Sequence, residues 1–461
     1  MRGNAPPGEG GVSPALDRVE AERSGIAESV SSFPVDRTAA EPSTIPGDPP
    51  AKIPLATWYA LAVLTVVNIF AAMDRVSLSI LMEPIKAELA LSDKQLGLLS
   101  GLAFALFYAL LGIPLASLAD RRSRVRLISA CLALWSAMTA LSGVAQNYYQ
   151  LFAARMGVGV GEAGCVPPAH SLIGDYFSRE KRALALSLFN TGAAIGAACG
   201  MFIVGSLAQN LGWRSALQII GLFGLPIALL TILTLREPPR PKSAQSTKET
   251  VFQTIGALLS RRAYVHVGIA FSLSQVCSHG LAQWVPSFLI RSFDMKLPEI
   301  GAWLGGISFG GGVAGVLAGG VLTSALMPRN PRWELWVPTT ALALAAPCIL
   351  VVVLSPAPWV ALMMIFCTHF LVATAAISIS AVQSFAEPHR RATAVAMVML
   401  AGSLIGGGAG SYLIGATSDF LMPTFGTESL RYAFVLVAFL QLWGATHYWL
   451  ASRSAARDRV A

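Results

Sequence analysis

The sequence predicts an all-α polytopic membrane protein with twelve transmembrane helices in two pseudo-symmetric halves of six. Of the 461 residues, 54% are hydrophobic and 13% are charged, whereas soluble domains carry about a quarter of charged residues. Apolar runs near the bilayer-spanning length of about 20 residues recur from residue 56 to residue 451. A polar, proline-rich stretch, REPPRPKSAQSTKET, divides these runs into two equal groups.

The twelve spans follow one another with short polar loops between them. They are expected at 56–82, 96–119, 125–144, 148–170, 183–206, 214–235, 264–290, 299–325, 334–354, 359–385, 391–416 and 430–451. Most of the lysines and arginines lie in the loops after even-numbered spans, which places both termini in the cytoplasm. A bacterial inner (plasma) membrane is the expected location. The net charge of +8 arises from these loops, so no nucleic-acid partner is expected.

The segments outside the spans complete the domain organisation. Residues 1–52 are polar and lack the apolar core of a signal peptide, so a disordered cytoplasmic tail is expected there. The halves are assigned to 53–236 and 263–452, with a cytoplasmic linker at 237–262 and a cytoplasmic tail at 453–461. In the linker, VFQTIGALLSRR has helical periodicity, which fits either a membrane-surface helix or a plain linker helix.

The two halves share local sequence patterns. KRALALSLFNTGAAIGAACG at 181–200 resembles RRATAVAMVMLAGSLIGGGAG at 390–410, and GWRSAL at 212–217 resembles SLRYAF at 429–434. Similar spacing in both halves favours duplication of a six-helix unit. Transporters built from such repeats bind substrate near the middle of the membrane, between the halves.

Four charged side chains lie within predicted spans: Asp74, Arg75, Arg155 and Glu162. Arg155 and Glu162 are two turns apart on one helix face, among glycines that let a neighbouring backbone approach. Asp74 and Arg155 come out at similar depth, so a contact between them is expected. Charges at this depth are costly and mark substrate or proton pathways. Asp74 and Glu162 are therefore candidate proton carriers and Arg75 and Arg155 candidate anion ligands; the alternative is a static ion pair between the first and fourth helices.

The seventh span offers uncharged polar groups that could complete such a cavity. Gln275, His279 and Gln283 recur at four-residue spacing, which places them on one helix face, and Trp284 follows directly. These four are the expected substrate contacts of the second half, although a stripe packed against other helices has the same spacing. His369 and Thr374 in the tenth span fit either a cavity wall or a packed core.

The sequence lacks the motifs of energy-coupling or metal-dependent enzymes. It contains no P-loop, and no HExxH or GxSxG in a suitable context, so neither ATP hydrolysis nor enzyme chemistry is expected. The six cysteines lie in apolar runs without metal-binding spacing. No metal and no cofactor are expected.

The loop after the second span carries the first family resemblance. GIPLASLADRRSRVR resembles the loop motif of the major facilitator superfamily, with Asp120, Arg121 and Arg124 at the matching positions. The resemblance implies that these three residues latch one conformation. Two glycines of the motif are replaced, by Ala116 and Ser123. Further along, Arg155 with Gly159 and Gly161 resembles the superfamily's fourth-helix motif, and Gly192, Gly196 and Gly200 resemble its fifth-helix exporter motif without the proline.

A narrower resemblance rests on three short stretches. MDR at 73–75, GVGVGEA at 157–163 and REPPR at 236–240 are similar to the Spinster group of that superfamily. This resemblance implies a secondary transporter that works by alternating access on sphingolipids, sphingosine-1-phosphate or lysophospholipids.

The expected function is proton-coupled movement of an amphipathic, lipid-like anion by a monomer surrounded by membrane lipids. The first alternative is a proton-linked symporter of a small organic anion, such as a carboxylate or a sugar acid. Such a symporter would need arginines from both halves in its binding site. A more remote alternative is a membrane enzyme or receptor on the same scaffold.

Overall fold

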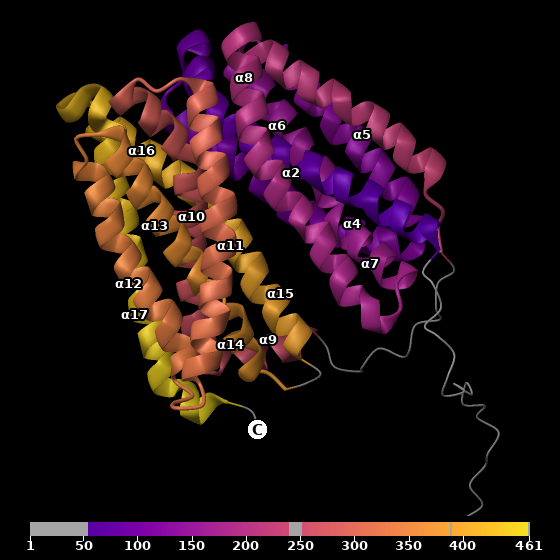
Figure 1. Ribbon diagram of the computed structural model, residues 1–461, viewed down its shortest axis with the longest axis vertical. Coiled ribbons are helices and arrows are strands. Elements are labelled where there is room, and N and C mark those ends of the chain that lie inside the picture. The colour runs from indigo at the N-terminus through magenta and orange to yellow at the C-terminus, as the bar shows by residue number, and fades with distance from the viewer. Residues whose placement is uncertain (1–53, 239–250, 388–389, 460–461) are drawn as a thin grey trace, which may run out of the picture. The chain divides into compact units, whose positions relative to one another are not determined.

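The computed structural model describes residues 54–238, 251–387 and 390–459 (Figure 1). In the first half the helices are α2 (Leu55–Leu89), α3 (Asp93–Gly97), η1 (Leu98–Leu102), α4 (Ala103–Arg121), α5 (Arg124–Ser142), α6 (Tyr148–Ala163), α7 (Val166–Tyr176) and α8 (Arg179–Thr234). Then follow α9 (Val251–Leu259), α10 (Arg262–Phe293), α11 (Leu297–Leu326), α12 (Trp333–Leu354), α13 (Pro358–Ala375), α14 (Ser378–Ser384), α15 (Arg391–Ala401), η2 (Gly402–Gly407), α16 (Gly408–Phe425), η3 (Gly426–Glu428) and α17 (Ser429–Asp458).

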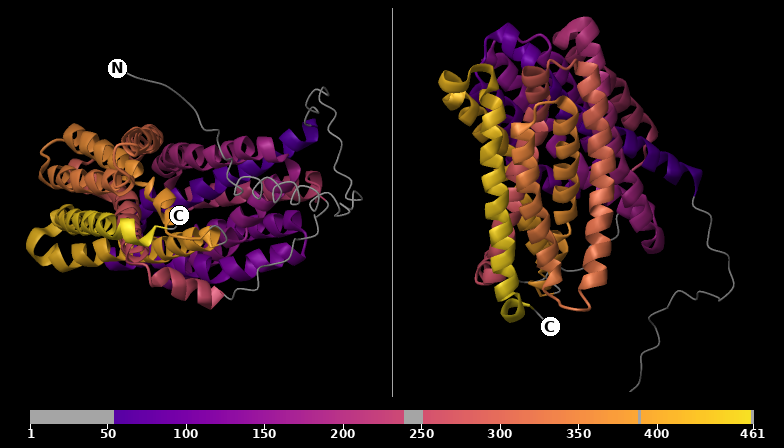
Figure 2. Two further views of the ribbon diagram at one scale, coloured as in Figure 1. Left: turned by 90° about the horizontal axis from the view of Figure 1, so that it is seen from below. Right: turned by 60° about the vertical axis from the view of Figure 1, so that its left-hand side comes forward.

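These elements make the twelve predicted spans in two groups of six. Helices α2 to α8 pack on one another, and so do α10 to α17, as the indigo-to-magenta and orange-to-yellow ribbons show (Figures 1 and 2). The fifth and sixth spans are both contained in α8, which bends at Gly212. The backbone there has φ +81°, a conformation that glycine adopts without the steric cost of a side chain.

Several spans that the sequence predicts as single helices are interrupted. The fourth breaks between α6 and α7 at Gly164 and Cys165, and Pro167 and Pro168 lie in the first turn of α7. A proline lacks the N–H that would continue the ladder of hydrogen bonds. The second and eleventh spans contain the π-helical segments η1 and η2. Such wide turns inside α-helices frequently occur at functional sites.

Apolarity alone identifies most of the spans. Eight helical stretches of the described chain are long and apolar enough to cross a membrane, two of which contain a pair of spans each. The α6–α7 and α10 stretches are absent from that set. They are the fourth and seventh spans, which carry Arg155, Glu162 and the polar stripe of α10. The other two charged residues at membrane depth, Asp74 and Arg75, lie in α2, which is apolar enough to belong to that set.

Glycines bring the helices of the site together. A Cβ on Gly196 of α8 would lie 2.2 Å from the carbonyl oxygen of Ile69 in α2, and one on Gly159 of α6 would lie 2.7 Å from that of Phe104 in α4. Backbones can approach this closely only where the side chain is absent. The glycine motifs of the fourth and fifth spans thus act in helix packing.

The segments outside the spans are described only in part. The predicted tail at 1–52 lies outside the described residues, and so does 239–250 of the linker. The helix predicted from VFQTIGALLSRR is present as α9. Helix α17 continues to Asp458, so most of the predicted tail at 453–461 is helical. Below, the distal end is where α2 ends and α3 begins, and the terminal end is where α2 begins and α17 ends.

Candidate functional site

A cavity of about 540 Å³ lies between the two halves. It is lined by Arg75, Ser100, Gly101, Phe104, Ala105, Tyr108, Ala109, Gly112, Arg155, Pro167, His279, Gln283, Ala396, Met399, Leu400, Ser403 and Gly407. Near the distal end, Ser100 of η1 and Ser411 of α16 are hydrogen-bonded hydroxyl to hydroxyl, and this contact joins the two halves. The wall extends from there to residues of α7 and α15 nearer the terminal end.

Asp74 lies behind the cavity wall and has two side-chain partners. Arg155 Nη1 donates to its Oδ2 at 3.3 Å, which confirms the contact expected from their matching depth. Thr139 of α5 donates its hydroxyl to Oδ1 at 2.5 Å. All three residues are at most 2% exposed. This trio forms a buried charged connection among α2, α5 and α6.

Arg75 is the more exposed of the two arginines that line the cavity. Its Nε donates to Glu162 Oε2 at 2.5 Å, and its side chain is 39% exposed, whereas Glu162 is fully buried. The guanidinium carbon lies 5.9 Å from the ring centre of Phe104 and 5.6 Å from that of Tyr108. Aromatic faces attract a guanidinium, so α4 helps to hold it in place.

Three atoms of this charged group are buried without a hydrogen-bond partner among the described residues: Arg75 Nη2, Arg155 Nε and Glu162 Oε1. A buried polar atom that makes no hydrogen bond costs free energy. The two guanidinium atoms can donate to an anion, and the carboxyl oxygen can carry a proton. The site therefore has free donors for an anion and a free carboxyl oxygen for a proton, the two roles that the sequence predicts.

The polar stripe of α10 divides in the structure. His279 and Gln283 line the cavity as predicted. Gln275 does not, because it packs against Gly402 and Gly406 of η2. Trp284 is also not a cavity residue: its ring is fully buried and its Nε1 donates to the carbonyl oxygen of Ser411 at 2.8 Å. Neither residue lines this cavity, because α10 packs closely against the η2–α16 helix at both positions, and their role as substrate contacts stays a prediction.

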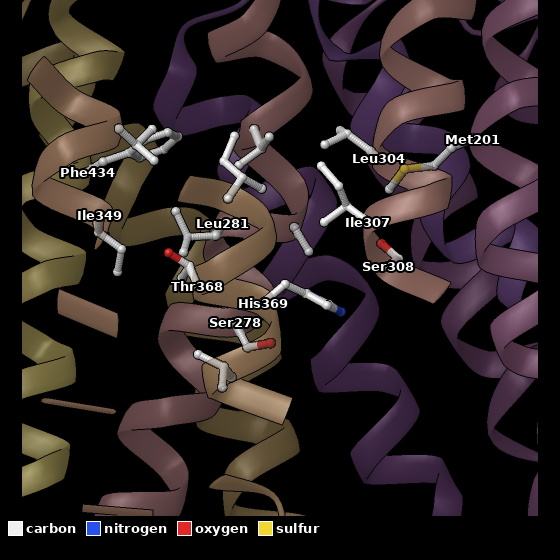
Figure 3. A pocket seen from close by; sticks show the side chains of 15 residues that line it. Met201, Ser278, Leu281, Leu304, Ile307, Ser308, Ile349, Thr368, His369 and Phe434 are labelled. Carbon is white, nitrogen blue, oxygen red and sulfur yellow. The ribbon is translucent and has the colours of Figure 1, made fainter. Parts of the chain in front are cut away.

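A second pocket, of about 90 Å³, lies beside α10 and is mostly apolar (Figure 3). Phe434, Leu304 and Met201 are among its apolar side chains. In the view of Figure 3 the polar Ser278, Ser308 and His369 lie below them. Thr368 also lines the pocket, and its hydroxyl is buried without a partner among the described residues. His369 thus belongs to a pocket wall. Thr374 instead donates its hydroxyl to the backbone of Phe370 and is buried.

The candidate latch residues at the terminal end differ in their surroundings. Arg124 is buried and donates to Asp175 at 2.5 Å and to Glu237, of the REPPR stretch, at 2.8 Å. Asp120 and Arg121 are exposed. Partial burial raises the pKa of Glu237, but hydrogen bonds from Arg124, Val125 N–H and Ser123 outweigh it, and the net pKa lies below the ordinary value.

Ser123, which stands where the loop motif has a glycine, has a clear role. It is the N-cap of α5, where its hydroxyl accepts from Arg126 N–H. The same hydroxyl donates to Glu237 at 2.9 Å. A serine at an N-cap satisfies an amide that a helix cannot pair internally, so the substitution is compatible with a well-formed loop.

The arrangement of two six-helix groups around a charged cavity matches known proteins. Residues 64–411 match the model of the Major Facilitator Superfamily. An "MFS-type efflux pump" of Mycolicibacterium smegmatis is 34% identical over 88% of this chain and 95% of that protein. The chain belongs to the major facilitator superfamily. It is an integral, multi-pass membrane transporter and not an enzyme.

Within the superfamily the chain is Spinster-like. The sphingosine-1-phosphate transporter SPNS2 of Danio rerio is 28% identical over 84% of this chain and 82% of that protein. A solved bacterial homologue of the human lysosomal transporter Spinster, inward-facing and unoccupied, superimposes with a TM-score of 0.81. It has 28% identity and covers 90% of this chain and 100% of that one. The sequence-based recognition of the family and of the twelve-helix fold is confirmed.

Sequence reasoning missed three residues of the site. Thr139 holds Asp74, and Phe104 and Tyr108 lie against Arg75. The spacing of the two aromatic residues, one helical turn apart, places them on one face and could have indicated a shared role. Nothing in the sequence near Thr139 distinguishes it from other threonines in apolar spans.

Proposed function

We propose that the chain moves an amphipathic, lipid-like anion of the sphingoid-phosphate or lysophospholipid class, by alternating access and coupled to protons. The observation that carries the proposal is the division of the binding space. One partly exposed guanidinium, Arg75, lines a cavity that also contains Arg155, and a pocket without charged side chains lies beside α10, mostly in the other half. The headgroup would bind in the cavity, and the tail would bind in the pocket.

Arg75 is the proposed headgroup ligand. Its planar fork suits a phosphate or a carboxylate, and its free Nη2 can donate to one without breaking the bond to Glu162. Arg155 is nearly fully buried against Asp74. Its proposed role in binding is therefore secondary: Arg155 lines the cavity, but its partnerless Nε is buried. His279 and Gln283 are proposed as uncharged headgroup contacts from the second half.

Glu162 and Asp74 are the proposed proton carriers. Glu162 has one oxygen on Arg75 and one without a partner, and it is fully buried. An anionic headgroup on Nη2 would share the positive charge of Arg75, so the buried charge of Glu162 would be less well compensated, and protonation would then relieve it. Binding of the anion and of a proton would thus favour each other.

Topology and direction belong to the same proposal. The loop charges favour both termini in the cytoplasm of a bacterial cell, which makes the terminal end the cytoplasmic one. The similarity to a protein named an efflux pump favours outward movement. A monomer is the proposed transporting unit.

The binding test is a thermal-shift comparison on purified protein. A ligand of the folded state raises the melting temperature by mass action. Lysophospholipids and sphingoid phosphates should stabilise the protein more than small carboxylates or sugar acids do. That stabilisation should be lost in Arg75→Gln and retained in Glu162→Gln, which keeps the guanidinium. Stabilisation by small acids alone would contradict the lipid proposal and support a small-anion symporter.

The coupling test uses proteoliposomes with an imposed pH gradient. Glu162→Gln and Asp74→Asn should abolish gradient-driven transport while downhill exchange of the same lipid survives. An unaltered response to the gradient in both variants would remove these carboxyls from the coupling mechanism.

A further inference from the structure

The distal end is joined by a compact set of charges that lies outside the cavity. Arg291, at the end of α10, donates from Nε to Glu83 of α2 at 3.0 Å. Its Nη1 donates to Oδ2 of Asp93 at 2.7 Å, and Asp93 is the first residue of α3. The Arg291 side chain is 8% exposed and that of Asp93 is fully buried. One arginine of the second half thus neutralises two carboxylates of the first half.

Asp93 also has a cation that belongs to its own half. Lys86 of α2 donates to Asp93 Oδ1 at 2.6 Å. From the other half, Ser418 of α16 donates to Oδ2 at 2.6 Å. If the halves separate at this end, Asp93 loses Arg291 and Ser418 but can keep Lys86. The two cations in contact with Asp93 therefore differ in which conformations they can stabilise.

Asp419, next to Ser418, caps a helix of the opposite half. Its Oδ1 accepts from the backbone N–H of Asp93 at 3.0 Å, and its Oδ2 accepts from that of Lys94 at 2.8 Å. The first amides of a helix have no acceptor within it. The next amide, of Gln95, is capped within the first half by Ser92. The amides of Asp93 and Lys94 consequently depend on the second half for their hydrogen bonds.

Close backbone packing accompanies these polar contacts. A Cβ on Gly415 of α16 would lie 2.3 Å from the carbonyl oxygen of Asp93, and one on Gly97 of α3 would lie 2.5 Å from that of Ser411. The cap and the ion pairs can form only when α3 and α16 are this close. The distal contacts therefore form or break as a set.

We propose that Arg291 and Asp419 are the residues that hold the distal end shut during the transport cycle, and that Lys86 keeps Asp93 neutralised when it opens. The proposal rests on the alternating access in the proposed function, and it is independent of the substrate. It assigns opposite effects to two cations in contact with the same carboxylate. Loss of Arg291 removes bonds of the closed state only. Loss of Lys86 leaves Asp93 without a cation in the open state, so it favours closure.

Hydrogen–deuterium exchange measured by mass spectrometry tests this on the full chain in nanodiscs, without substrate. The amides of Asp93 and Lys94 are the reporters, because Asp419 is their acceptor in the closed state. In Arg291→Gln their exchange should be faster by about tenfold or more, the scale expected for losing hydrogen bonds between charged groups. In Lys86→Gln, the matched control that removes the same charge, exchange should be unchanged or slower. Arg291→Lys should lie between the wild type and Arg291→Gln.

Exchange in the core of α12 serves as the folding control. If Arg291→Gln also accelerates exchange in α12, the substitution destabilises the whole protein. Arg291→Lys is then the variant that is compared with Lys86→Gln. Equal acceleration by Lys86→Gln and the decisive Arg291 variant would overturn the proposal. Wild-type exchange in that Arg291 variant would overturn it as well. Either result would leave the lipid-binding proposal intact, since its test uses melting with added ligand.

Discussion

Replacing Thr139 by valine tests how Asp74 is stabilised inside the first half. The substitution keeps the shape of the side chain and removes the hydroxyl that donates to Asp74 Oδ1 at 2.5 Å. Thr139 is 1% exposed and Asp74 is 2% exposed, so water does not readily replace the lost donor. Asp74 would keep only the longer contact with Arg155, at 3.3 Å.

The expected loss follows from the charge of the acceptor. A hydrogen bond to a charged group contributes about 1.5–3 kcal/mol, and one between neutral groups contributes about 1 kcal/mol. Thr139→Val should therefore lower the free energy of unfolding by about 2 kcal/mol. In an Asp74→Asn background the same substitution should cost only about 1 kcal/mol, because the acceptor is then neutral.

These substitutions form a double-mutant cycle of wild type, Thr139→Val, Asp74→Asn and the double variant. Equilibrium unfolding by SDS in mixed micelles, followed by circular dichroism, measures the stability of all four proteins. Thr139→Ser, which keeps the hydroxyl, is the control and should stay near the wild type in stability. Neutral substitutions change the free energy of unfolding by up to about 0.5 kcal/mol. A loss smaller than this for Thr139→Val would refute the view that Thr139 stabilises an ionised Asp74. An equal loss in both backgrounds would show that Asp74 is not ionised in the folded protein.

Further predictions concern the terminal-end ion pairs and helix packing. The lowered pKa of Glu237 means that its bonds to Arg124 stabilise the fold above the ordinary pKa of a glutamate and are lost as pH falls through the lowered one. The melting temperature of Glu237→Gln should thus lie below that of the wild type at neutral pH, with the difference shrinking below about pH 4; a constant difference would contradict this. Gly196→Ala, which brings a Cβ within 2.2 Å of Ile69 O, should destabilise by about 1–3 kcal/mol in the same SDS titration. Gly256→Ala in α9, where a Cβ meets nothing within 4 Å, should be neutral or slightly stabilising; equal losses at both glycines would rule out close packing as the cause.

The candidate site was only partly predictable. Depth along a helix can be counted from the sequence, and this placed Asp74 opposite Arg155 correctly. Exposure cannot be counted, because it depends on which neighbouring helix covers each face. Arg75 and Arg155 are therefore indistinguishable in the sequence, yet one faces the cavity and the other is buried. Gln275 and Trp284 share a helix with His279 and Gln283, but contact with η2 and α16 removes them from the cavity.

The sequence by itself determined the class, the helices and the family of this transporter. Apolar length, loop charge and short motifs are local properties, and a bilayer permits few structures other than helices for such runs. The tertiary structure alone decided the breaks beside the cavity, the partners of each charge and the contacts that close the distal end. Glu83, Asp93, Arg291 and Asp419 lie at the ends of separate spans, where charged residues are ordinary. Only the packing of α3 against α16 makes them one set. Ion pairs and helix caps act over a few ångströms, whereas Asp93 is 198 residues from Arg291 and 326 residues from Asp419 along the chain.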